Sequence, residues 1–140
     1  MIKTCSIRPD MARGVAMKCA DLVVVGLASA PEVSLDDVLR RVEERSAQMW
    51  VVFDNGRPVS VSFTEIVSDG GVRFVAVFGL SGRSVWRWAR LFADTIVAFA
   101  VSEGCDAVRF FGRRSWARLV PGCRNIGCED GQAMFERPAR

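Results

Sequence analysis

Apolar residues recur at the spacing of a helix in the first part of the chain. From Pro9 to about Ala28 they return every three or four positions, and the same pattern begins again after Ser34. The Ser34 side chain can cap the second helix, with Asp37 three residues on. The short apolar segment 2–7 precedes both helices and is expected to form a strand.

Extended segments follow the two predicted helices. Asn55-Gly56 is typical of a tight hairpin turn, and Ser68 to Gly71 predicts a second turn. Between the turns, apolar residues alternate with Ser and Thr, which is the period of a strand with two different faces. The three segments, predicted to form an antiparallel meander, are 49–54, 59–67 and 72–79.

The last part of the chain combines one long helix with shorter elements. Apolar residues at helical spacing run from Val85 to near Gly104, a glycine that can end the helix. The elements expected after it are a strand at 107–111, a short helix at 112–119, and a hairpin made of 126–128 and 132–136. The sequence therefore predicts a single α+β domain over 1–140. It has a mixed, mostly antiparallel sheet, two N-terminal helices, one long helix after the meander and a short C-terminal helix.

Composition narrows the classes of function. The 140 residues are 50% apolar and 25% charged, which is typical of a globular domain, and a net charge of +3 does not by itself indicate a nucleic-acid partner. No apolar run reaches the roughly 18 residues of a membrane span, and the first ten residues lack a signal-peptide core, so neither is expected. The absence of His excludes His-based catalysis and His metal ligands, and the absence of Tyr excludes a phenol as the general acid. The five scattered cysteines predict reduced thiols and no metal site.

The order of these elements resembles the GCN5-related N-acetyltransferase (GNAT) fold over essentially the whole chain. A narrower pattern near the C-terminus comprises Phe99-Ala100, Glu103-Gly104-Cys105 and the run from Gly112 to Leu119. This pattern is similar to that of small GNAT-like proteins encoded among phage structural and morphogenesis genes. Some of those are internal virion proteins, and others are named as acetyltransferases.

The resemblance implies a loop between the fourth strand and the long helix, where backbone N–H groups bind the pyrophosphate of acetyl-CoA. The residues here that match it, and are the candidates for cofactor binding, are Gly79, Ser81, Gly82, Arg83 and Ser84. Their glycines do not fall at the family's paired spacing, and the bulky Trp86 follows. A short turn that enters a capped helix is an equally good interpretation.

The resemblance also implies an acid for the departing thiolate, usually a Tyr, and a base for the attacking amine. The chain has no Tyr, and Ser115 is the hydroxyl in the corresponding region. Glu65, on the second strand of the meander, is the candidate base by position. The alternative is a solvent-exposed carboxylate without a catalytic role.

Basic and aromatic residues crowd the segment after the fifth strand. One interpretation is a surface that binds an acidic partner protein or a phosphate backbone. The other places Trp116 in the core and leaves the arginines as a solvated rim. The candidate partner-binding residues are Arg109, Arg113, Arg114, Trp116 and Arg118.

The missing Tyr and His and the altered loop favour a non-enzymatic GNAT-like component of a bacteriophage particle, structural or for assembly. Such a component would contact other phage structural proteins or copies of itself, in the host cytoplasm during assembly or in the virion, and would need no cofactor. The first alternative is an acetyl-CoA-dependent N-acyltransferase that uses Glu65. The second is a nucleic-acid-binding module, which predicts an affinity that falls steeply with salt.

Overall fold

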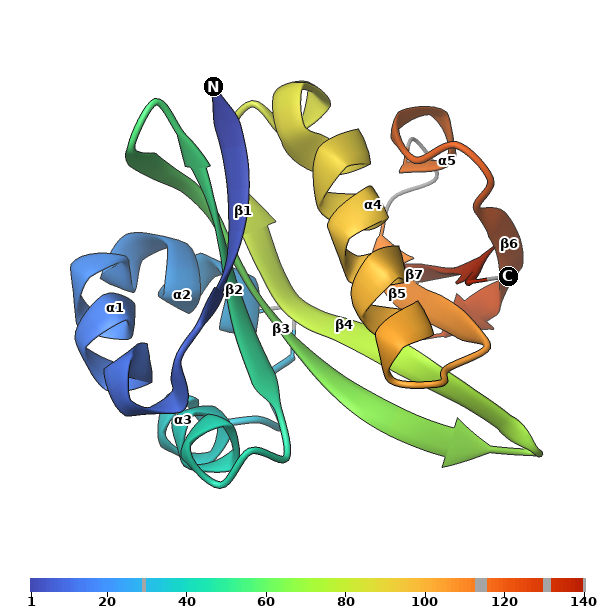
Figure 1. The fold of residues 1–140 in the computed structure, drawn as a ribbon, viewed down its shortest axis with the longest axis horizontal. Helices are drawn as coiled ribbons and strands as arrows, with labels where there is room; N and C mark the ends of the chain where they lie inside the picture. Colours follow the sequence, from blue (N-terminus) through green and yellow to red (C-terminus); the bar gives the residue numbers. More distant parts are fainter. Residues whose placement is uncertain (29, 113–115, 130–131, 140) are drawn as a thin grey trace. The chain divides into compact units, whose positions relative to one another are not determined.

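The computed structural model describes residues 1–28, 30–112, 116–129 and 132–139 (Figure 1). Its strands are β1 (Ile2–Ile7), β2 (Gln48–Asp54), β3 (Arg57–Asp69), β4 (Val72–Gly82), β5 (Ala107–Gly112), β6 (Arg124–Glu129) and β7 (Gln132–Pro138). The helical segments are the 3-10 turn η1 (Pro9–Met11) and the helices α1 (Ala12–Lys18), α2 (Ala20–Leu27), α3 (Leu35–Glu43), α4 (Val85–Ser102) and α5 (Trp116–Leu119). The strands form one 7-stranded sheet in the order β1-β2-β3-β4-β5-β7-β6. The predicted α+β fold and the order of its elements are confirmed.

The chain divides into two compact units. The first consists of Met1–Glu65 and Phe78–Val85, and the second of Ile66–Val77 and Trp86–Arg140. The expectation of a single domain over 1–140 stays a prediction. No helix in the described part of the chain has both the length and the apolar character that crossing a membrane requires.

In the first unit, β1, β2 and the start of β3 pair antiparallel, with Cys5 opposite Val51 and Val51 opposite Val61. The turn between β2 and β3 has positive φ angles at Asn55 (51°) and Gly56 (82°), as a type I′ hairpin requires. The local sequence thus determines this hairpin, and its prediction is confirmed.

The helices of the first unit pack on one face of this sheet. Alternation along the strands directs Met49, Val51, Val61 and Phe63 to that face. There they form a buried cluster with apolar residues of all three helices, among them Ala16, Val23, Val38 and Val42. The apolar positions of the two predicted helices therefore make the core of this unit.

Two helix ends show how closely the sequence pattern predicts local structure. The Ser34 side chain accepts a hydrogen bond from the Asp37 N–H at 3.1 Å, so the predicted cap is confirmed. The continuous helix predicted from Pro9 to Ala28 is instead bent at Cys19, whose φ and ψ of −112° and 29° lie outside the helical region. Hydrogen bonds from Cys19 N–H to Val15 and from Val23 N–H to Cys19 span the bend. With this bend, the buried residues of α1 and those of α2 both face the sheet.

The opposite face of β3 is also buried, although its side chains are polar. Ser60, Ser62 and Thr64 are each 0% exposed. Trp50 Nε1–H donates to Thr64 Oγ1 at 2.9 Å, and the Thr64 hydroxyl donates to Gln48 Oε1 at 2.7 Å. The polar half of the alternating pattern therefore does not mark a solvent-exposed face.

Two glycines allow helix α2 to lie directly against strand β4. Gly79 has a φ of 62°, which a glycine adopts without strain. A Cβ atom on Gly26 would overlap the carbonyl oxygen of Gly79 and lie 2.9 Å from its carbonyl carbon. A Cβ on Gly79 would in turn lie 3.0 Å from the Phe63 ring and 3.1 Å from Leu27. The two backbones are therefore in direct contact, and neither position has room for a larger residue.

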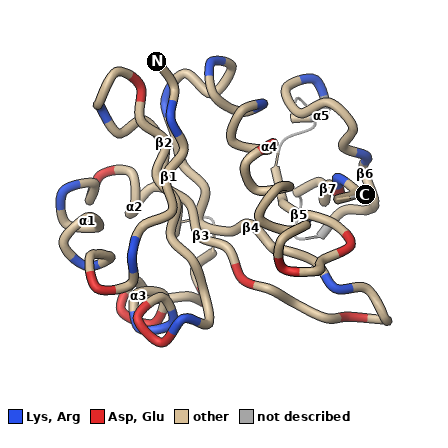
Figure 2. The backbone as a smooth tube through the Cα atoms, viewed as in Figure 1, with Lys and Arg blue, Asp and Glu red and all other residues tan. Residues whose placement is uncertain are grey.

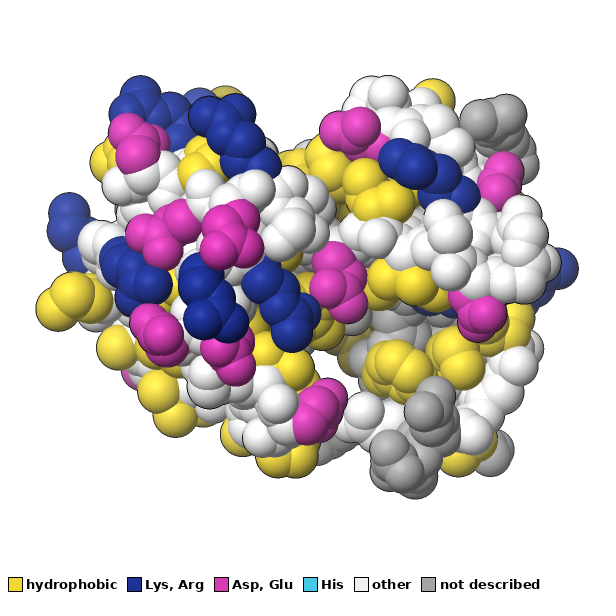
Figure 3. All heavy atoms as spheres, turned by 90° about the horizontal axis from the view of Figure 1, so that it is seen from below, with side chains coloured by type: hydrophobic (Ala, Val, Ile, Leu, Met, Phe, Trp, Pro, Cys, Tyr) yellow, Lys and Arg dark blue, Asp and Glu magenta, His cyan; other side chains and the backbone are white. Residues whose placement is uncertain are grey.

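Ion pairs connect α1 and α3 at the surface of the first unit. Arg13 pairs with Asp36 at 3.0 Å and with Glu43 at 2.9 Å. Figure 2 shows basic and acidic residues interspersed along α1 and α3, and Figure 3 shows basic and acidic side chains side by side over this region. These side chains are exposed, and such pairs contribute little to stability.

In the second unit, α4 presents one buried stripe made of Trp88, Ala89, Phe92, Ile96 and Ala100. The helix ends where Gly104 adopts a φ of 70° and the Cys105 N–H donates to the Ala100 carbonyl at 2.8 Å. The predicted end of the helix is confirmed.

Strand β5 pairs parallel with β4 over Phe74–Val77 and Ala107–Phe110, and β7 pairs antiparallel with both β5 and β6. Trp116 packs against Trp88 and Phe110, with ring centroids 6.4 and 5.8 Å away. A Cβ on Gly112 would lie 2.7 Å from the Trp116 ring. Gly112 and Trp116 of the C-terminal motif therefore fit each other as packing partners.

A buried carboxylate joins three strands of the second unit. Glu136 on β7 lies opposite Arg109 on β5 and Arg124 on β6. Its side chain is 8% exposed and accepts hydrogen bonds from Arg124 at 2.7 Å and Arg109 at 2.8 Å. The bond from Arg124, followed by that from Arg109, lowers the pKa of Glu136 below its ordinary value.

The Glu136→Gln variant is expected to lose about 2 kcal/mol of unfolding free energy at neutral pH, because charge-assisted hydrogen bonds become neutral ones. Because folding lowers the pKa of Glu136, its contribution is complete above the unfolded pKa of about 4.3 and disappears as pH falls through the folded value. Urea unfolding between pH 3 and pH 7 measures the unfolding free energy of the wild-type protein and of the Glu136→Gln variant. The difference in unfolding free energy between them should shrink below about pH 4.3. The exposed Glu103→Gln is the control; equal losses in both variants would contradict this account.

The Gly26→Ala variant is expected to lose about 1 to 3 kcal/mol, because the added methyl group overpacks the contact with Gly79. Gly14→Ala in α1 is the matched control, since a Cβ there meets nothing within 4 Å. Alanine normally stabilises a helix relative to glycine by about 0.5 to 1 kcal/mol, so the two variants should change thermal stability in opposite directions. Stabilisation by both would show that α2 and β4 are not in contact.

Candidate functional site

The candidate site is the segment Gly79 to Ser84, here called the β4–α4 loop, which lies wholly in the first unit. The strand that was expected to end at Gly79 continues to Gly82, so the segment comprises the last four residues of β4 and the two residues before α4. It begins at the contact of Gly79 with Gly26 described above. Among the described residues, the pairing of β4 with β5 ends at Val77 and Phe110, although β4 continues to Gly82. The loop thus follows the point at which β4 leaves its parallel neighbour.

Ser81 places a hydroxyl inside this loop. Its side chain is 7% exposed, and no hydrogen-bond partner for its Oγ is found among the described residues. The Ser81 Cβ is 3.3 Å from where a Cβ of Gly26 would lie, so the side chain is on the side of α2. A buried hydroxyl without a partner is costly, and a polar ligand atom would satisfy it.

Arg83 supplies positive charge to the loop, but it already has partners. Its backbone N–H donates to the Val59 carbonyl at 2.9 Å, and its guanidinium pairs with Asp21 at the start of α2. The side chains of this ion pair are 65% and 63% exposed. An ion pair so open to water is weak, so an anionic ligand can replace Asp21 at little cost.

The end of the loop leads directly into a helix. Gly82 and Ser84 are exposed, and Ser84 has a φ of 52°. Helix α4 begins one residue later, and the first N–H groups of any helix lack acceptors within the helix. Together with the helix dipole and the Arg83 side chain, these groups favour a negatively charged ligand. All five sequence-predicted residues are therefore brought together in one loop whose chemistry fits a phosphate.

Glu65, the candidate base, lies on β3 in the same unit. Arg41 of α3 donates to its Oε2 at 3.3 Å, and the Glu65 side chain is 35% exposed. The carboxylate is thus at least partly solvated and directed at α3. Ser115 lies outside the described residues.

The candidate partner-binding residues occupy several environments. Arg109 is 22% exposed, pairs with Glu136 and lies 4.2 Å above the Phe74 ring, and Trp116 packs in the aromatic cluster. Arg118 is exposed in the last turn of α5, whereas Arg113 and Arg114 lie outside the described residues. A common binding surface for these residues stays a prediction.

The thiols do not form a second site among the residues that the structure describes. Cys19 and Cys105 are buried, and all five cysteines are free. Burial raises the pKa of the Cys19 and Cys123 thiols, which keeps both protonated at neutral pH. No group of three or more Cys, Asp or Glu side chains suited to a metal ion occurs within the described ranges.

Two residues of the site were not identified from the sequence. Asp21 forms the ion pair with Arg83, and Gly26 packs against the backbone of Gly79, where the loop begins. A glycine in the middle of an apolar helix was the available signal, because glycine there is unfavourable unless another backbone comes close. The Asp21 pairing left no local signal, since the two residues are 62 positions apart.

Comparison with known proteins places this geometry in a fold family. No protein-family model and no curated protein sequence matches the chain. Its structure is similar to a GNAT-family acetyltransferase from Staphylococcus aureus Mu50, with a TM-score of 0.67 and 11% identity over 100% of both chains. FeeM, an N-acyl amino acid synthase from uncultured soil microbes, has a TM-score of 0.68 and 11% identity over 99% of this chain and 91% of its own. PaiA N-acetyltransferase from Thermoplasma acidophilum, in complex with coenzyme A, has a TM-score of 0.59 and 8% identity over 99% of both chains.

These likenesses correct the first interpretation of the sequence. A non-enzymatic component of a phage particle is contradicted, because the similar structures are acyltransferases that match the chain along its whole length. Nothing in the comparisons links the chain to a phage. The missing Tyr and the altered glycine spacing therefore do not by themselves support a non-enzymatic role. The chain therefore has a GNAT-like fold, an α+β architecture with a mixed 7-stranded sheet.

Proposed function

We propose that this chain is an acyl-CoA-dependent N-acyltransferase. The observation that carries the proposal is the β4–α4 loop, which combines an exchangeable Arg83, an unpartnered Ser81 hydroxyl and the start of an 18-residue helix. It lies in a fold shared with acyltransferases, one of which is in complex with coenzyme A. Coenzyme A was expected only under the alternative interpretation, and that alternative is now the better one.

The loop residues have distinct roles in this proposal. The backbone of Gly82 and Ser84 and the guanidinium of Arg83 would hold the diphosphate, since fixed N–H donors and a cation suit that charge. The edge of β4 beyond Val77 has no β5 partner among the described residues, and such an edge can bind an extended chain that carries amides.

Bound acyl-CoA supplies an activated thioester carbonyl. The acceptor amine forms the new C–N bond at that carbonyl, the C–S bond breaks, and the amine loses a proton. Glu65, directly or through water, would take this proton. A thiol is acidic enough to leave as thiolate without prior protonation, so the proposed reaction does not require a Tyr acid.

Calorimetric titration with acetyl-CoA tests the binding part of the proposal. At a hundred times the dissociation constant, the ligand should add about 2.7 kcal/mol to the unfolding free energy, which a thermal shift also detects. Release of free thiol in the presence of a panel of primary amines tests transfer. No binding at millimolar acetyl-CoA would refute the proposed function.

Arg83→Gln is expected to weaken acetyl-CoA binding roughly tenfold, because a charge-assisted contact to phosphate is lost. Asp21→Asn should strengthen binding by roughly two- to fivefold, because it removes the carboxylate that competes for Arg83. Calorimetry measures both variants, and Arg57→Gln, an exposed cation of the same unit, is the control. Equal affinities in all three variants would exclude this loop as the phosphate site.

Glu65→Gln is expected to lower kcat about 10² to 10⁴-fold while leaving the dissociation constant of acetyl-CoA unchanged, as loss of a general base predicts. Glu44→Gln, an exposed carboxylate at the end of α3, is the control. A variant that keeps the wild-type rate would assign the proton transfer to another group.

A further inference from the structure

The ion pair that contains the candidate base uses little of its hydrogen-bonding capacity. Arg41 Nη1 donates to Glu65 Oε2 at 3.3 Å, whereas Arg40 on the same helix contacts Asp37 at 2.8 Å. Among the described residues, the Arg41 guanidinium makes no second hydrogen bond, and Glu65 Oε1 accepts none. A guanidinium has five N–H donors and a carboxylate accepts on both oxygens, so most of the donors and acceptors of this pair are available to a ligand.

Both side chains of the pair are accessible to a ligand. The side chain of Arg41 is 40% exposed and that of Glu65 is 35% exposed. Because water screens an ion pair at such a position, a ligand can separate the two groups at little cost. Protein covers the larger part of each side chain, so contacts that a ligand makes there are screened less than contacts on a fully exposed surface.

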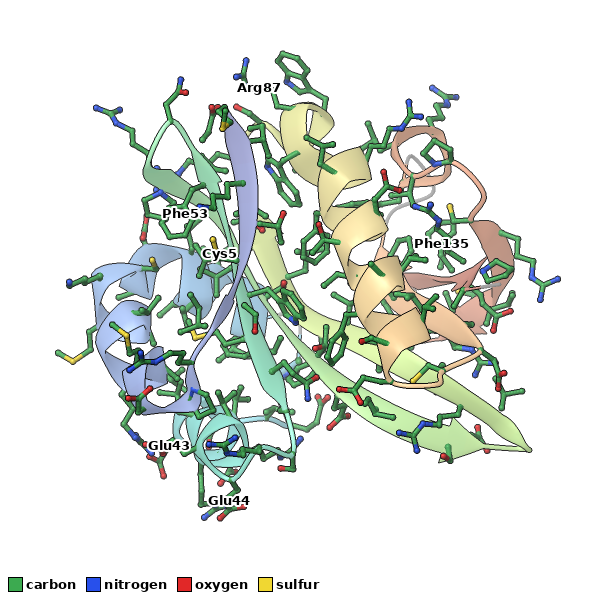
Figure 4. The ribbon with its side chains drawn as sticks, viewed as in Figure 1. Cys5, Glu43, Glu44, Phe53, Arg87 and Phe135 are labelled. Carbon is green, nitrogen blue, oxygen red and sulfur yellow. The ribbon has the colours of Figure 1, made fainter. Side chains whose placement is uncertain are left out.

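The neighbouring carboxylates of α3 do not compete for Arg41. Glu43 is bound by Arg13 of α1 at 2.9 Å, and Glu44 is exposed. Figure 4 shows Glu43 and Glu44 at the outer end of α3, with their side chains directed away from the strands. A carboxylate that enters from solution would therefore replace one contact of Arg41, the bond to Glu65.

The backbone holds both charged residues in place. The Arg41 carbonyl accepts hydrogen bonds from the Ser46 N–H at 2.9 Å, the Ser46 hydroxyl at 3.2 Å and the Ala47 N–H at 3.2 Å. These bonds fix the end of α3 just before β2 begins, and Glu65 is fixed within β3. Charged groups on a helix and a strand are positioned more precisely than groups on a loop, which suits recognition of a small ligand.

The pair lies on the same face of the sheet as the start of the β4–α4 loop. Phe63 and Glu65 are two residues apart on β3, so they face the same side at a Cα separation of about 7 Å. The Phe63 ring stacks on Phe78 and lies 3.0 Å from where a Cβ of Gly79 would be. An acceptor bound at Glu65 would therefore be on the side of the first unit where this loop begins.

The two charges of the pair complement those of a zwitterion. An α-amino acid carries its amine and its carboxylate on one carbon, with the nitrogen and the carboxyl carbon about 2.5 Å apart. The carboxylate can accept two parallel hydrogen bonds from Arg41, and the ammonium group can take the place of Arg41 at Glu65. Every charge then keeps a partner. An amine without a carboxylate would compete for Glu65 and leave the guanidinium unpaired.

We propose that Arg41 and Glu65 together select α-amino acids as the acceptors of this protein, with Arg41 binding the carboxylate and Glu65 the amine. This inference rests on the proposed function and adds no step to the reaction. It names the class of acceptor, which the proposed function leaves open.

The test compares acetyl transfer to the standard amino acids with transfer to their amides, which lack the carboxylate. The wild-type protein should have the higher kcat/KM for an amino acid than for its amide. In Arg41→Gln the ratio of the two should fall about 10- to 100-fold, through KM, because charge-assisted contacts to the carboxylate are lost. An effect of the substitution on Glu65 acts on both acceptors and cancels in this ratio.

Two further variants show whether the fall is specific. Arg41→Lys keeps the charge without the planar fork and should recover part of the preference for the carboxylate. Arg40→Gln removes the neighbouring arginine, which pairs with Asp37, and should keep the wild-type ratio as the matched control. Thermal unfolding of each variant checks that it is folded.

The outcomes distinguish this inference from the proposed function. If the wild-type protein acetylates amines without preferring amino acids over their amides, the role of Arg41 is overturned and the proposed function stands. The same holds if Arg41→Gln keeps the wild-type ratio, or if Arg40→Gln lowers the ratio equally. If no amine of either kind causes release of thiol from acetyl-CoA, both are overturned.

Discussion

The contact between Gly26 and Gly79 is the constraint on which the first unit depends. It sets the distance of α2 from β4 at the backbone level, with no side chain in between. The turn of the chain at Gly79, the inward side chain of Ser81 and the pairing of Arg83 with Asp21 all follow from α2 lying this close. The inner side of the loop is therefore fixed by packing, and its outer side is open to solvent. An anion site needs both, because its donors must be held in place and must be accessible to the ligand.

Local signals in the sequence predicted most of the fold. The Asn55-Gly56 turn, the Ser34 cap and the glycine that ends α4 each act within a few residues, and the structure confirms all three. The candidate residues of the β4–α4 loop came from a local pattern too, a strand followed by small residues and a helix, but the strand continues to Gly82 and the binding role of these residues stays a prediction. What the loop contacts was not identified.

The features that sequence reasoning missed depend on residues far apart in the chain. Arg83 and Asp21 are separated by 62 positions, and Arg109 and Glu136 by 27. Alternation in β3 indicated two faces but gave no sign that Ser60 and Ser62 are buried, since burial depends on what covers a strand. The interpretation of function was wrong for a related reason: residues absent from a motif were weighed more heavily than the fold as a whole, which is that of acyltransferases.

The row formed by Arg109, Glu136 and Arg124 also determines how the C-terminal strands align. A strand that slips by one residue turns every side chain to the opposite face, so a shifted β7 would leave Glu136 away from both arginines. The apolar pattern of β6 is too weak to prevent this, because Gly127 and Cys128 are exposed and a bulge interrupts the pairing after Asn125. Electrostatic complementarity across three strands thus specifies the pairing register where hydrophobic alternation does not.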